Sequence, residues 1–375
     1  MRLNRAVTGL ALAATVTMTS ACSLPVPEDP FPRAALQAGL DNLVETQAAS
    51  AALLRIQEGQ HEWSAAAGMQ ELSSTVPVSA SSRLRIGSIT KTFVATVVLQ
   101  LVDEGRLALD DPIERHLPGV VPSGATITVR QILNHTSGIY DYAHEHDWST
   151  NRWRGDARFR TYRPQELLDV GFATPPYFPS GQGWHYSNTN YVIAGLLVER
   201  LTGKRYGAAV TERIIHPLRL NQTTVPGTDP TLPEPHAHGY TEVGGGFVDA
   251  TEMNPSLDWA AGEMISTASD LNRYVAALLG GELTSPAALA AMRETIETAP
   301  DQLFRYGLGL QQFDLPCGAT VFGHSGELLG YLTYALATED GSRQLTLSYN
   351  PLKDAEGTGE IVVGIASESF CPPAG

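Results

Sequence analysis

Residues 88–105 read SITKTFVATVVLQLVDEG and form the clearest helical pattern in the chain. The apolar side chains recur at intervals of three and four residues, which is the spacing of one face of an α-helix. Gly105 stands where helices commonly end on a glycine in the left-handed conformation. Because the helix begins at Ser88, the side chains of Ser88 and Lys91 are three residues apart and face the same way.

This serine–lysine pair is a candidate nucleophile with its activating base. A serine hydroxyl is a weak nucleophile until a neighbouring base takes its proton, and apolar surroundings can lower the pKa of a lysine amine enough to serve. The start of the helix adds backbone N–H groups that can stabilise a developing oxyanion. Taken alone, the pair also fits a helix-capping serine beside a solvated lysine.

Two further short motifs follow the pair in chain order. Tyr186-Ser187-Asn188 immediately precedes a helical pattern, and His324-Ser325-Gly326 immediately precedes a predicted strand. Taken singly, they fit a half-buried tyrosine, a helix-capping asparagine and a histidine at a strand end. The second motif also invites comparison with the Gly-x-Ser-x-Gly turn of α/β-hydrolases, but Glu327 stands where that turn needs its last glycine.

Together, the three motifs resemble those of the penicillin-recognising serine enzymes, in particular the class C β-lactamase and DD-carboxypeptidase family and its exported DD-carboxypeptidase branch. Residues 103–107, 109–112, 133–138 and 306–309 are similar too, and the resemblance runs from about Leu36 to Cys371. It implies an α+β fold of the β-lactamase/transpeptidase type, in which an antiparallel sheet is flanked by helices. An all-helical second lobe would stand beside the sheet, with the active site in the cleft between them.

The resemblance also implies catalytic roles. Ser88 would attack a carbonyl carbon and form an acyl-enzyme, while Lys91 and Tyr186 would share the transfer of its proton. A phenol with a pKa near 10 can take part only if a neighbouring cation stabilises its phenolate. His324 stands where relatives often carry lysine and would lie beside Tyr186 across the cleft.

Substrate-binding residues are implied in the same way. Asn188 would hydrogen-bond the substrate amide, and the backbone N–H groups of Ser88 and Glu327 would form the oxyanion hole. Ser325 would offer its hydroxyl to the substrate, and Gly326 would complete the binding strand.

Strand patterns occur at both ends of the chain, and helical patterns fill the middle. Residues 51–69 alternate around a Glu58-Gly59 turn and predict a hairpin. Further strands are predicted at 306–313, 320–322, 331–337 and 344–349, and further helices at 36–49, 128–134, 191–201, 269–279 and 286–298. We expect an α/β domain built from residues 33–110 and 260–375, with residues 111–259 inserted as a mostly helical domain.

The composition restricts the partners of this chain. Of 375 residues, 43% are hydrophobic and 17% are charged, so the chain has ample apolar material for a core and is not disordered. Its formal net charge of −15 would be repelled by nucleic acid and by anionic lipid surfaces. The pairs His144/His146 and His236/His238 lie in polar loops without a cysteine cluster, so we expect no metal site and no cofactor.

The N-terminal segment has the features of an export signal. Arg2 and Arg5 precede an apolar or small run over residues 6–18, which has the length of a signal-peptide core and is too short for a mature membrane span. The run ends in Thr-Ser-Ala-Cys at residues 19–22, which resembles the lipobox of bacterial lipoproteins, although Thr19 departs from the usual leucine.

We therefore expect a signal peptide over residues 1–21, then a proline-rich spacer over residues 22–32 that is anchored through an acylated Cys22. The open alternative is ordinary cleavage that releases a soluble protein. Three cysteines leave one unpaired in an exported chain, and lipidation of Cys22 would leave Cys317 and Cys371 to form one disulfide.

These observations predict an exported serine hydrolase that cleaves amide or ester bonds. The first candidate substrate is the D-alanyl-D-alanine terminus of cell-wall peptides, and the nearest alternative is a β-lactamase or esterase of the same fold. A non-catalytic surface-binding lipoprotein is the second alternative, although a binding module needs no intact Ser88, Lys91 and Tyr186. The membrane would be contacted only through the lipid anchor.

One position departs from related carboxypeptidases, which commonly place a hydroxyl residue after His-x-Gly and a basic residue on the adjoining strand. This chain has Glu327 at the first place and Gln311 and Gln312 in the preceding strand. A Glu327 carboxylate aimed into the pocket would repel the terminal carboxylate of a substrate, whereas one turned outward would leave only its backbone N–H facing the substrate. We expect weak DD-carboxypeptidase activity and better turnover of esters, amides or amine-bearing substrates.

Overall fold

The computed structural model describes residues 30–144, 155–300, 302–352 and 357–371. The predicted signal peptide, Cys22 and His146 lie outside these residues. None of the described helices is long and apolar enough to cross a membrane.

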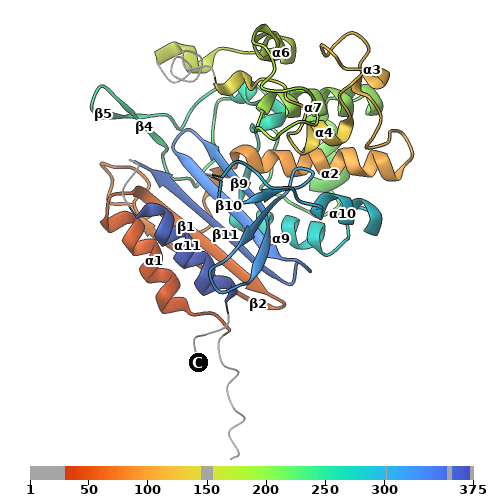
Figure 1. The fold of residues 1–375 in the computed structure, drawn as a ribbon. Helices are drawn as coiled ribbons and strands as arrows, with labels where there is room; N and C mark the ends of the chain where they lie inside the picture. The colour runs from red at the N-terminus through yellow and green to blue at the C-terminus, as the bar shows by residue number, and fades with distance from the viewer. Residues whose placement is uncertain (1–29, 145–154, 301, 353–356, 372–375) are drawn as a thin grey trace, which may run out of the picture. The chain divides into compact units, whose positions relative to one another are not determined.

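A seven-stranded antiparallel sheet lies at the centre of the described chain (Figure 1). Its strands run in the order β2-β1-β11-β10-β9-β8-β7, so the first strands of the chain pair directly with the last. The strands are β1 Ala49–Glu58, β2 His61–Gly68, β7 Arg305–Tyr306, β8 Gln311–Asp314, β9 Thr320–Leu328, β10 Tyr331–Thr338 and β11 Arg343–Pro351. Two small sheets pair β3 Arg83–Arg85 with β6 Ile265–Thr267, and β4 Tyr240–Val243 with β5 Gly246–Asp249.

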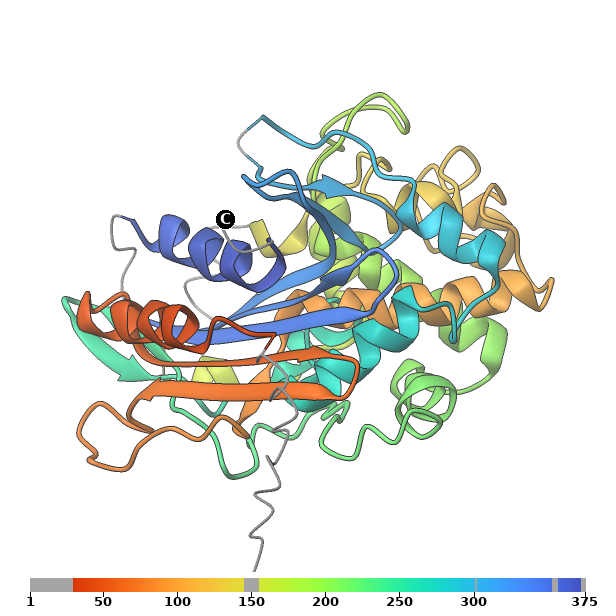
Figure 2. The ribbon, with the colours of Figure 1, turned by 90° about the horizontal axis from the view of Figure 1, so that it is seen from below.

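Helices cover both faces of the large sheet (Figure 2). On one face, α1 (Arg33–Glu45) and α11 (Thr358–Phe370) lie side by side, and their apolar side chains share a core with those of β1, β10 and β11. On the other face, α9 (Ala268–Leu279) packs against β1, β10 and β11, and α2 (Thr90–Asp103) packs against β9.

Apolar and polar residues alternate along β11, although both faces of this strand are buried. Leu345 and Leu347 belong to the apolar core shared with α1 and α11. Thr346 points to the other face, where its hydroxyl donates to Asn272 Oδ1 of α9 over 2.7 Å. A strand that is buried on both faces can therefore keep alternate polar residues, because each is hydrogen-bonded.

The middle of the chain contributes α7 and α8, which pack against α2, and further helices that pack against α7. The α-helices in the described part of this region are α3 Ile113–His116, α4 Val129–Leu133, α6 Pro164–Ala173, α7 Asn188–Thr202 and α8 Tyr206–Val210, and α10 Pro286–Arg293 follows α9. Shorter 3-10 or π turns are η1 Gly87–Ile89, η2 Tyr142–His144, η3 Gly155–Phe159, η4 Thr211–Ile215, η5 Pro255–Leu257 and η6 Trp259–Ala261. In the described part of residues 111–259, no segment joins the large sheet. The division into two domains stays a prediction.

Local signals in the sequence place several elements correctly. The hairpin around Glu58 is confirmed as β1 and β2. The capping box at Thr128 is present, because its hydroxyl accepts the Gln131 N–H while the Gln131 side chain accepts the Thr128 N–H. Gly105 and Gly203 follow α2 and α7 in the left-handed conformation, with φ of +68° and +71°.

Two strand predictions were wrong. The stretch 306–313 is not one strand but two, because the chain turns between β7 and β8, where Gly309 has a φ of +72°. A Cβ on Gly309 would lie 2.6 Å from the Cβ of Ala95, so the turn packs tightly on α2. The motif at residues 324–326 lies inside β9 rather than before a strand, because the β9–β10 pairing continues through Leu328.

Two helix predictions differ at their ends. The helix predicted over residues 286–298 ends at Arg293, after which Ile296 pairs with Tyr306. The helix predicted over residues 36–49 is α1, which ends at Glu45 before β1 begins.

A disulfide joins Cys317, in the turn between β8 and β9, to Cys371 at the end of α11. These are the two cysteines of the expected pair. The bond ties the last helix to the sheet across 54 residues of chain.

Loss of this disulfide is predicted to destabilise the fold by about 2–5 kcal/mol, because the unfolded chain regains the freedom of a closed loop. Thermal melts of oxidised wild type and of the double variant Cys317→Ser/Cys371→Ser measure the difference. Reductant should lower the melting temperature of wild type and leave that of the double variant unchanged. Equal melting temperatures for the two oxidised proteins would contradict the prediction.

Candidate active site

Ser88 and Lys91 lie where the 3-10 turn η1 passes into α2. Lys91 Nζ is 3.0 Å from Ser88 Oγ, as the three-residue spacing predicts. Ser88 is half-buried, so its hydroxyl can be reached, whereas Lys91 is completely buried. The start of the helix therefore places an accessible hydroxyl beside an amine that is shielded from solvent.

The Lys91 amine has two further partners, both from distant segments. Nζ is 2.7 Å from Asn188 Oδ1 at the start of α7 and 2.7 Å from the Ala261 carbonyl oxygen in η6. The Asn188 amide orientation follows from its other end, since Nδ2 donates to Asp141 Oδ2 over 3.2 Å. Both partners can thus only accept a hydrogen bond from Lys91.

Burial changes the protonation of this amine. Loss of solvation lowers the pKa of Lys91 to about 7, and the carboxylates of Asp141 and Asp258 oppose this shift only in part. Near neutral pH, a substantial share of the molecules therefore carries a neutral amine. Asn188 and Ala261 occupy the two N–H donors of that amine, which leaves its lone pair for the proton of Ser88.

Tyr186 lies on the other side of the nucleophile. Its hydroxyl is hydrogen-bonded to the Ser88 side chain, and Lys91 Nζ lies 4.9 Å from the centroid of its ring. Burial raises the pKa of Tyr186 well above its ordinary value of 10, despite the hydrogen bond with Ser88. The phenol therefore keeps its proton and can pass protons on, but it is not a standing phenolate base.

A buried histidine that sequence reasoning missed holds the Tyr186 ring. The imidazole of His135 stacks on Tyr186 with centroids 4.3 Å apart, and its Nδ1 accepts the Ser187 N–H over 3.1 Å. Burial lowers the pKa of His135 well below its usual value, so the ring is neutral. Its only signal in the sequence is its place in the stretch 133–138, which resembles the family.

Asp141 was also missed, and the sequence offers no spacing signal for it. Its Oδ1 accepts the backbone N–H of Asn188 over 2.9 Å and that of Ala143 over 3.1 Å. Together with the Asn188 Nδ2 contact, these bonds fix the amide that faces Lys91. Asp141 is thus a positioning residue for the lysine.

His324 is buried in β9 and makes its contacts with Tyr306. Its Nε2 is 2.9 Å from the Tyr306 hydroxyl, and its Nδ1 donates to the Ser325 carbonyl. Burial lowers the pKa of His324 to about 3, so it does not supply the positive charge of a lysine. The ring of Tyr306 lies 6.0 Å from that of Tyr186, so His324 reaches Tyr186 through Tyr306.

Two glycines bring η1 and β9 together. A Cβ on Gly87 would lie 2.8 Å from the Glu327 nitrogen and 2.5 Å from its carbonyl oxygen. A Cβ on Gly326 would lie 1.9 Å from the Ile86 carbonyl oxygen. Because neither position has room for a side chain, the backbones of Ser88 and Glu327 lie close to each other.

The strand geometry directs the Glu327 N–H toward this junction. The Ser325 N–H points to the β8 side of β9, since it donates to Gln311 Oε1 over 2.6 Å. The N–H two residues further along a strand points the same way. Because the pairing with β8 reaches only Gly323, the Glu327 N–H is directed to an edge that no strand of the described sheet covers.

Side chains on β9 separate onto two faces. Gly326 faces η1, so Ser325 and Glu327 point to the opposite face of the sheet, with Tyr334 of β10. Glu327 is exposed, and its charge adds to the burial that raises the pKa of Tyr334. Of the two expected orientations of Glu327, the structure has the one in which the backbone N–H faces the nucleophile.

The histidine pair in the described loops makes polar contacts of its own. His238 Nδ1 is 2.6 Å from Asp249 Oδ2, and His236 Nδ1 is 3.3 Å from the Pro233 carbonyl oxygen. Among the described residues, no group of three or more His, Cys, Asp or Glu side chains could hold a metal ion.

Known proteins are similar to this chain in sequence and in fold. The Beta-lactamase family matches residues 33–369. Penicillin-binding protein 4 of Amycolatopsis lactamdurans is 30% identical, over 92% of this chain and 94% of its own length. Penicillin-binding protein 4* of Bacillus subtilis is 27% identical, over 86% of this chain and 72% of its own length.

Two solved structures resemble the chain closely. A D-stereospecific amidohydrolase from Streptomyces sp. is 40% identical with a TM-score of 0.83, over 91% of this chain and 99% of that one. The D-amino acid amidase of Ochrobactrum anthropi SV3 is 29% identical with a TM-score of 0.79, over 90% of this chain and 97% of that one. With the β-lactamase/transpeptidase-like fold and the serine–lysine–tyrosine site, these matches show that the chain belongs to the beta-lactamase family of serine hydrolases.

Proposed function

We propose that this hydrolase cleaves amides and esters of D-amino acids through an acyl-enzyme on Ser88. The observation that carries the proposal is the placement of the Ser88 hydroxyl between the buried Lys91 amine and the neutral Tyr186 phenol. The substrate class is supported by the 40% identity to a protein named a D-stereospecific amidohydrolase.

In the proposed acylation step, the neutral Lys91 amine takes the Ser88 proton while Oγ attacks the substrate carbonyl carbon. The N–H groups of Ser88 and Glu327 stabilise the oxyanion that forms. Tyr186 then delivers a proton to the leaving nitrogen or oxygen as the carbonyl–nitrogen or carbonyl–oxygen bond breaks, and the proton held by Lys91 replaces the one that Tyr186 gave up. Water attacks the acyl-enzyme in the second half of the reaction and releases the acid.

A preference for amides and esters over free D-alanyl-D-alanine follows from the charges beside β9. Gln311, on the strand next to β9, uses its Oε1 to accept from both the N–H and the hydroxyl of Ser325. Glu327 adds an exposed carboxylate to the same strand. A substrate carboxylate at this end of the site would meet a neutral amide in place of a cation, and the outward-turned Glu327 carboxylate would add negative charge at longer range.

A DD-carboxypeptidase is the second candidate, because both curated relatives are named penicillin-binding proteins. A β-lactamase or an esterase uses the same residues and differs in the rate at which its acyl-enzyme reacts with water. The complete set of Ser88, Lys91 and Tyr186 supports an enzyme over a binding protein.

We also propose that the protein is exported and held at the outer face of the cell membrane by a lipid on Cys22. The proposal rests on the apolar run, the small residues before Cys22 and the disulfide between the other two cysteines. Mass spectrometry of the mature N-terminus tests it, and an unmodified N-terminus would favour a secreted soluble protein.

Substitution of Ser88→Ala or Lys91→Ala is predicted to reduce acylation by about a thousandfold or more, and the double variant should lose little further, because the two residues act as one unit. Labelling with a fluorescent penicillin, followed by mass spectrometry, measures acylation. Lys204→Ala, which removes an exposed lysine, is the matched control and should label like wild type. Wild-type labelling of Ser88→Ala would disprove the assigned nucleophile.

The rate of acylation is predicted to depend on pH through the ionisation of Lys91. The pKa of Lys91 is lowered to about 7, so the neutral amine is scarce below this pH and predominates above it. The second-order rate constant should therefore rise about tenfold per pH unit below pH 7 and level off above it. A rate that keeps rising beyond pH 9 would instead indicate the Tyr186 phenolate as the base.

The substrate preference is predicted to show in three compounds: D-alaninamide, L-alaninamide and D-alanyl-D-alanine. D-alaninamide should have the highest kcat/KM, and Glu327→Gln should raise kcat/KM for D-alanyl-D-alanine severalfold by removing a negative charge. Glu242→Gln, at an exposed site on β4, is the control. A wild-type preference for D-alanyl-D-alanine that Glu327→Gln leaves unchanged would establish the carboxypeptidase instead.

A further inference from the structure

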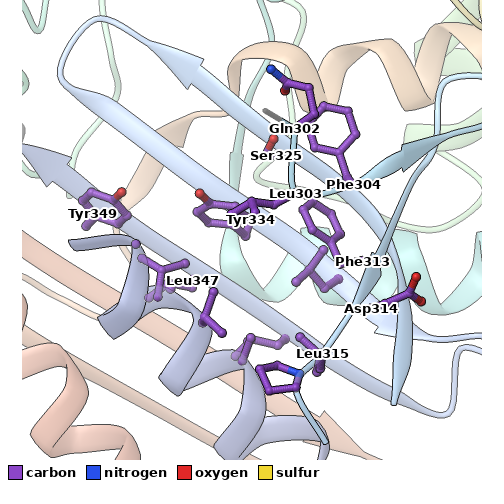
Figure 3. Close-up of a pocket in the computed structure, with 17 residues that line it drawn as sticks. Gln302, Leu303, Phe304, Phe313, Asp314, Leu315, Ser325, Tyr334, Leu347 and Tyr349 are labelled. Atoms are coloured by element: carbon purple, nitrogen blue, oxygen red, sulfur yellow. The ribbon is translucent and has the colours of Figure 1, made fainter. Parts of the chain in front are cut away.

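An apolar cavity of about 500 Å³ lies beside β9, on the face of the sheet that α11 covers. Figure 3 shows Phe313, Tyr334 and Leu347 lining it, with Ser325 toward one end. Val362 of α11 forms part of its wall. The site chemistry described above makes no use of this cavity.

The cavity begins next to the strand that stabilises the oxyanion. Ser325, which lines the cavity, is two residues from Glu327 on β9. A strand rises about 3.4 Å per residue, so the two positions are about 7 Å apart. A substrate whose carbonyl oxygen is held at the Glu327 N–H can therefore place a neighbouring group at the mouth of the cavity.

Aromatic rings connect the cavity to the catalytic tyrosine. The ring of Phe304 lies 5.8 Å from that of Phe313 in the cavity and 6.2 Å from that of Tyr306. The ring of Tyr306 lies 6.0 Å from that of Tyr186. The rings thus form a continuous apolar cluster from Tyr186 to the cavity, in which Tyr306 is completely buried and Phe304 is half-buried.

This direction identifies the part of the substrate that enters. The leaving nitrogen or oxygen must face its proton donor, Tyr186, when the carbonyl bond breaks. Groups attached to that atom can then extend along β9, past the half-buried ring of Phe304, toward Ser325 at the cavity mouth. We propose that the cavity binds an apolar, uncharged leaving group of the amide or ester substrate, an inference that rests on the proposed function.

The charges around the cavity favour uncharged groups. Among the described residues that line it, none is a lysine or arginine, and Asp314 contributes a carboxylate. The exposed carboxylate of Glu327 lies on the same face of the sheet. A leaving group that ends in a carboxylate would lose hydration without gaining a cation.

The reaction at this subsite is a simple acyl transfer. The bond from Ser88 Oγ to the carbonyl carbon forms, and the bond from that carbon to the leaving nitrogen breaks. The proton from Ser88 enters the Lys91 and Tyr186 pair, and one proton from that pair reaches the nitrogen. The product leaves the cavity as a neutral amine, and water then frees the D-amino acid.

The test compares D-alanyl ethyl-, butyl- and hexylamides, whose leaving amines have similar basicity, with D-alaninamide. In wild type, kcat/KM should rise about fourfold per added methylene until the chain fills the cavity. D-alanyl-6-aminohexanoate, which carries a carboxylate on a chain of similar length, should lose this gain.

Val362→Trp, which fills the cavity, should bring the ratio of hexylamide to ethylamide kcat/KM close to one. Glu368→Trp, on an exposed face of α11, is the matched control and should keep the wild-type ratio. Titration of reactive Ser88 with a penicillin corrects for misfolded protein. If Val362→Trp does not fold, Val362→Ala serves instead and should retain the gain and extend it to longer chains.

Three results would overturn the inference. The first is equal kcat/KM for the three alkylamides in wild type, with D-alaninamide still hydrolysed, and this would leave the proposed function intact. The second is a hexylamide preference that Val362→Trp leaves unchanged. The third is no turnover of any D-alanyl compound by protein that a penicillin still labels at Ser88, and this would remove the proposed function as well.

Discussion

The burial of one lysine amine is the constraint on which the rest of the site depends. Lys91 has no contact with water, and its three polar partners come from η1, from α7 and from η6. Burial favours the neutral amine, while Asn188 and Ala261 direct its lone pair toward Ser88. The helices around α2 therefore do more than form a core, because they exclude water and convert an ordinary lysine into a base at neutral pH.

Close approach of two backbones provides the second requirement, which is a place for the negative oxygen. Gly87 and Gly326 leave no space for a side chain between η1 and β9, and Gly309 does the same where the β7–β8 turn meets α2. The nucleophile and the edge of the sheet are thus held together by main chain. Such contacts vary little with side-chain motion, which suits a site where two N–H groups must point at one oxygen.

Alternate side chains of β9 point to opposite faces of the sheet, which separates the residues near the nucleophile from those that affect substrate selectivity. One face of the strand carries His324 and Gly326 toward the nucleophile, while the other carries Ser325 and Glu327 toward Tyr334. Positions on the second face can change the charge met by a substrate without moving the base or the oxyanion donors. Proteins similar to this chain carry names as different as penicillin-binding protein and D-amino acid amidase.

Features that depend on near neighbours followed from the sequence alone. The helix that pairs Ser88 with Lys91, the hairpin at Glu58, the capping box at Thr128 and the family of the chain all rest on spacings of a few residues or on short motifs. The tertiary structure alone decided the burial of Lys91, its partners 97 and 170 residues away, the roles of His135 and Asp141, and the face on which Glu327 lies. Residue spacing carries no information about which distant segments exclude water from a side chain, and that exclusion sets the pKa of the base.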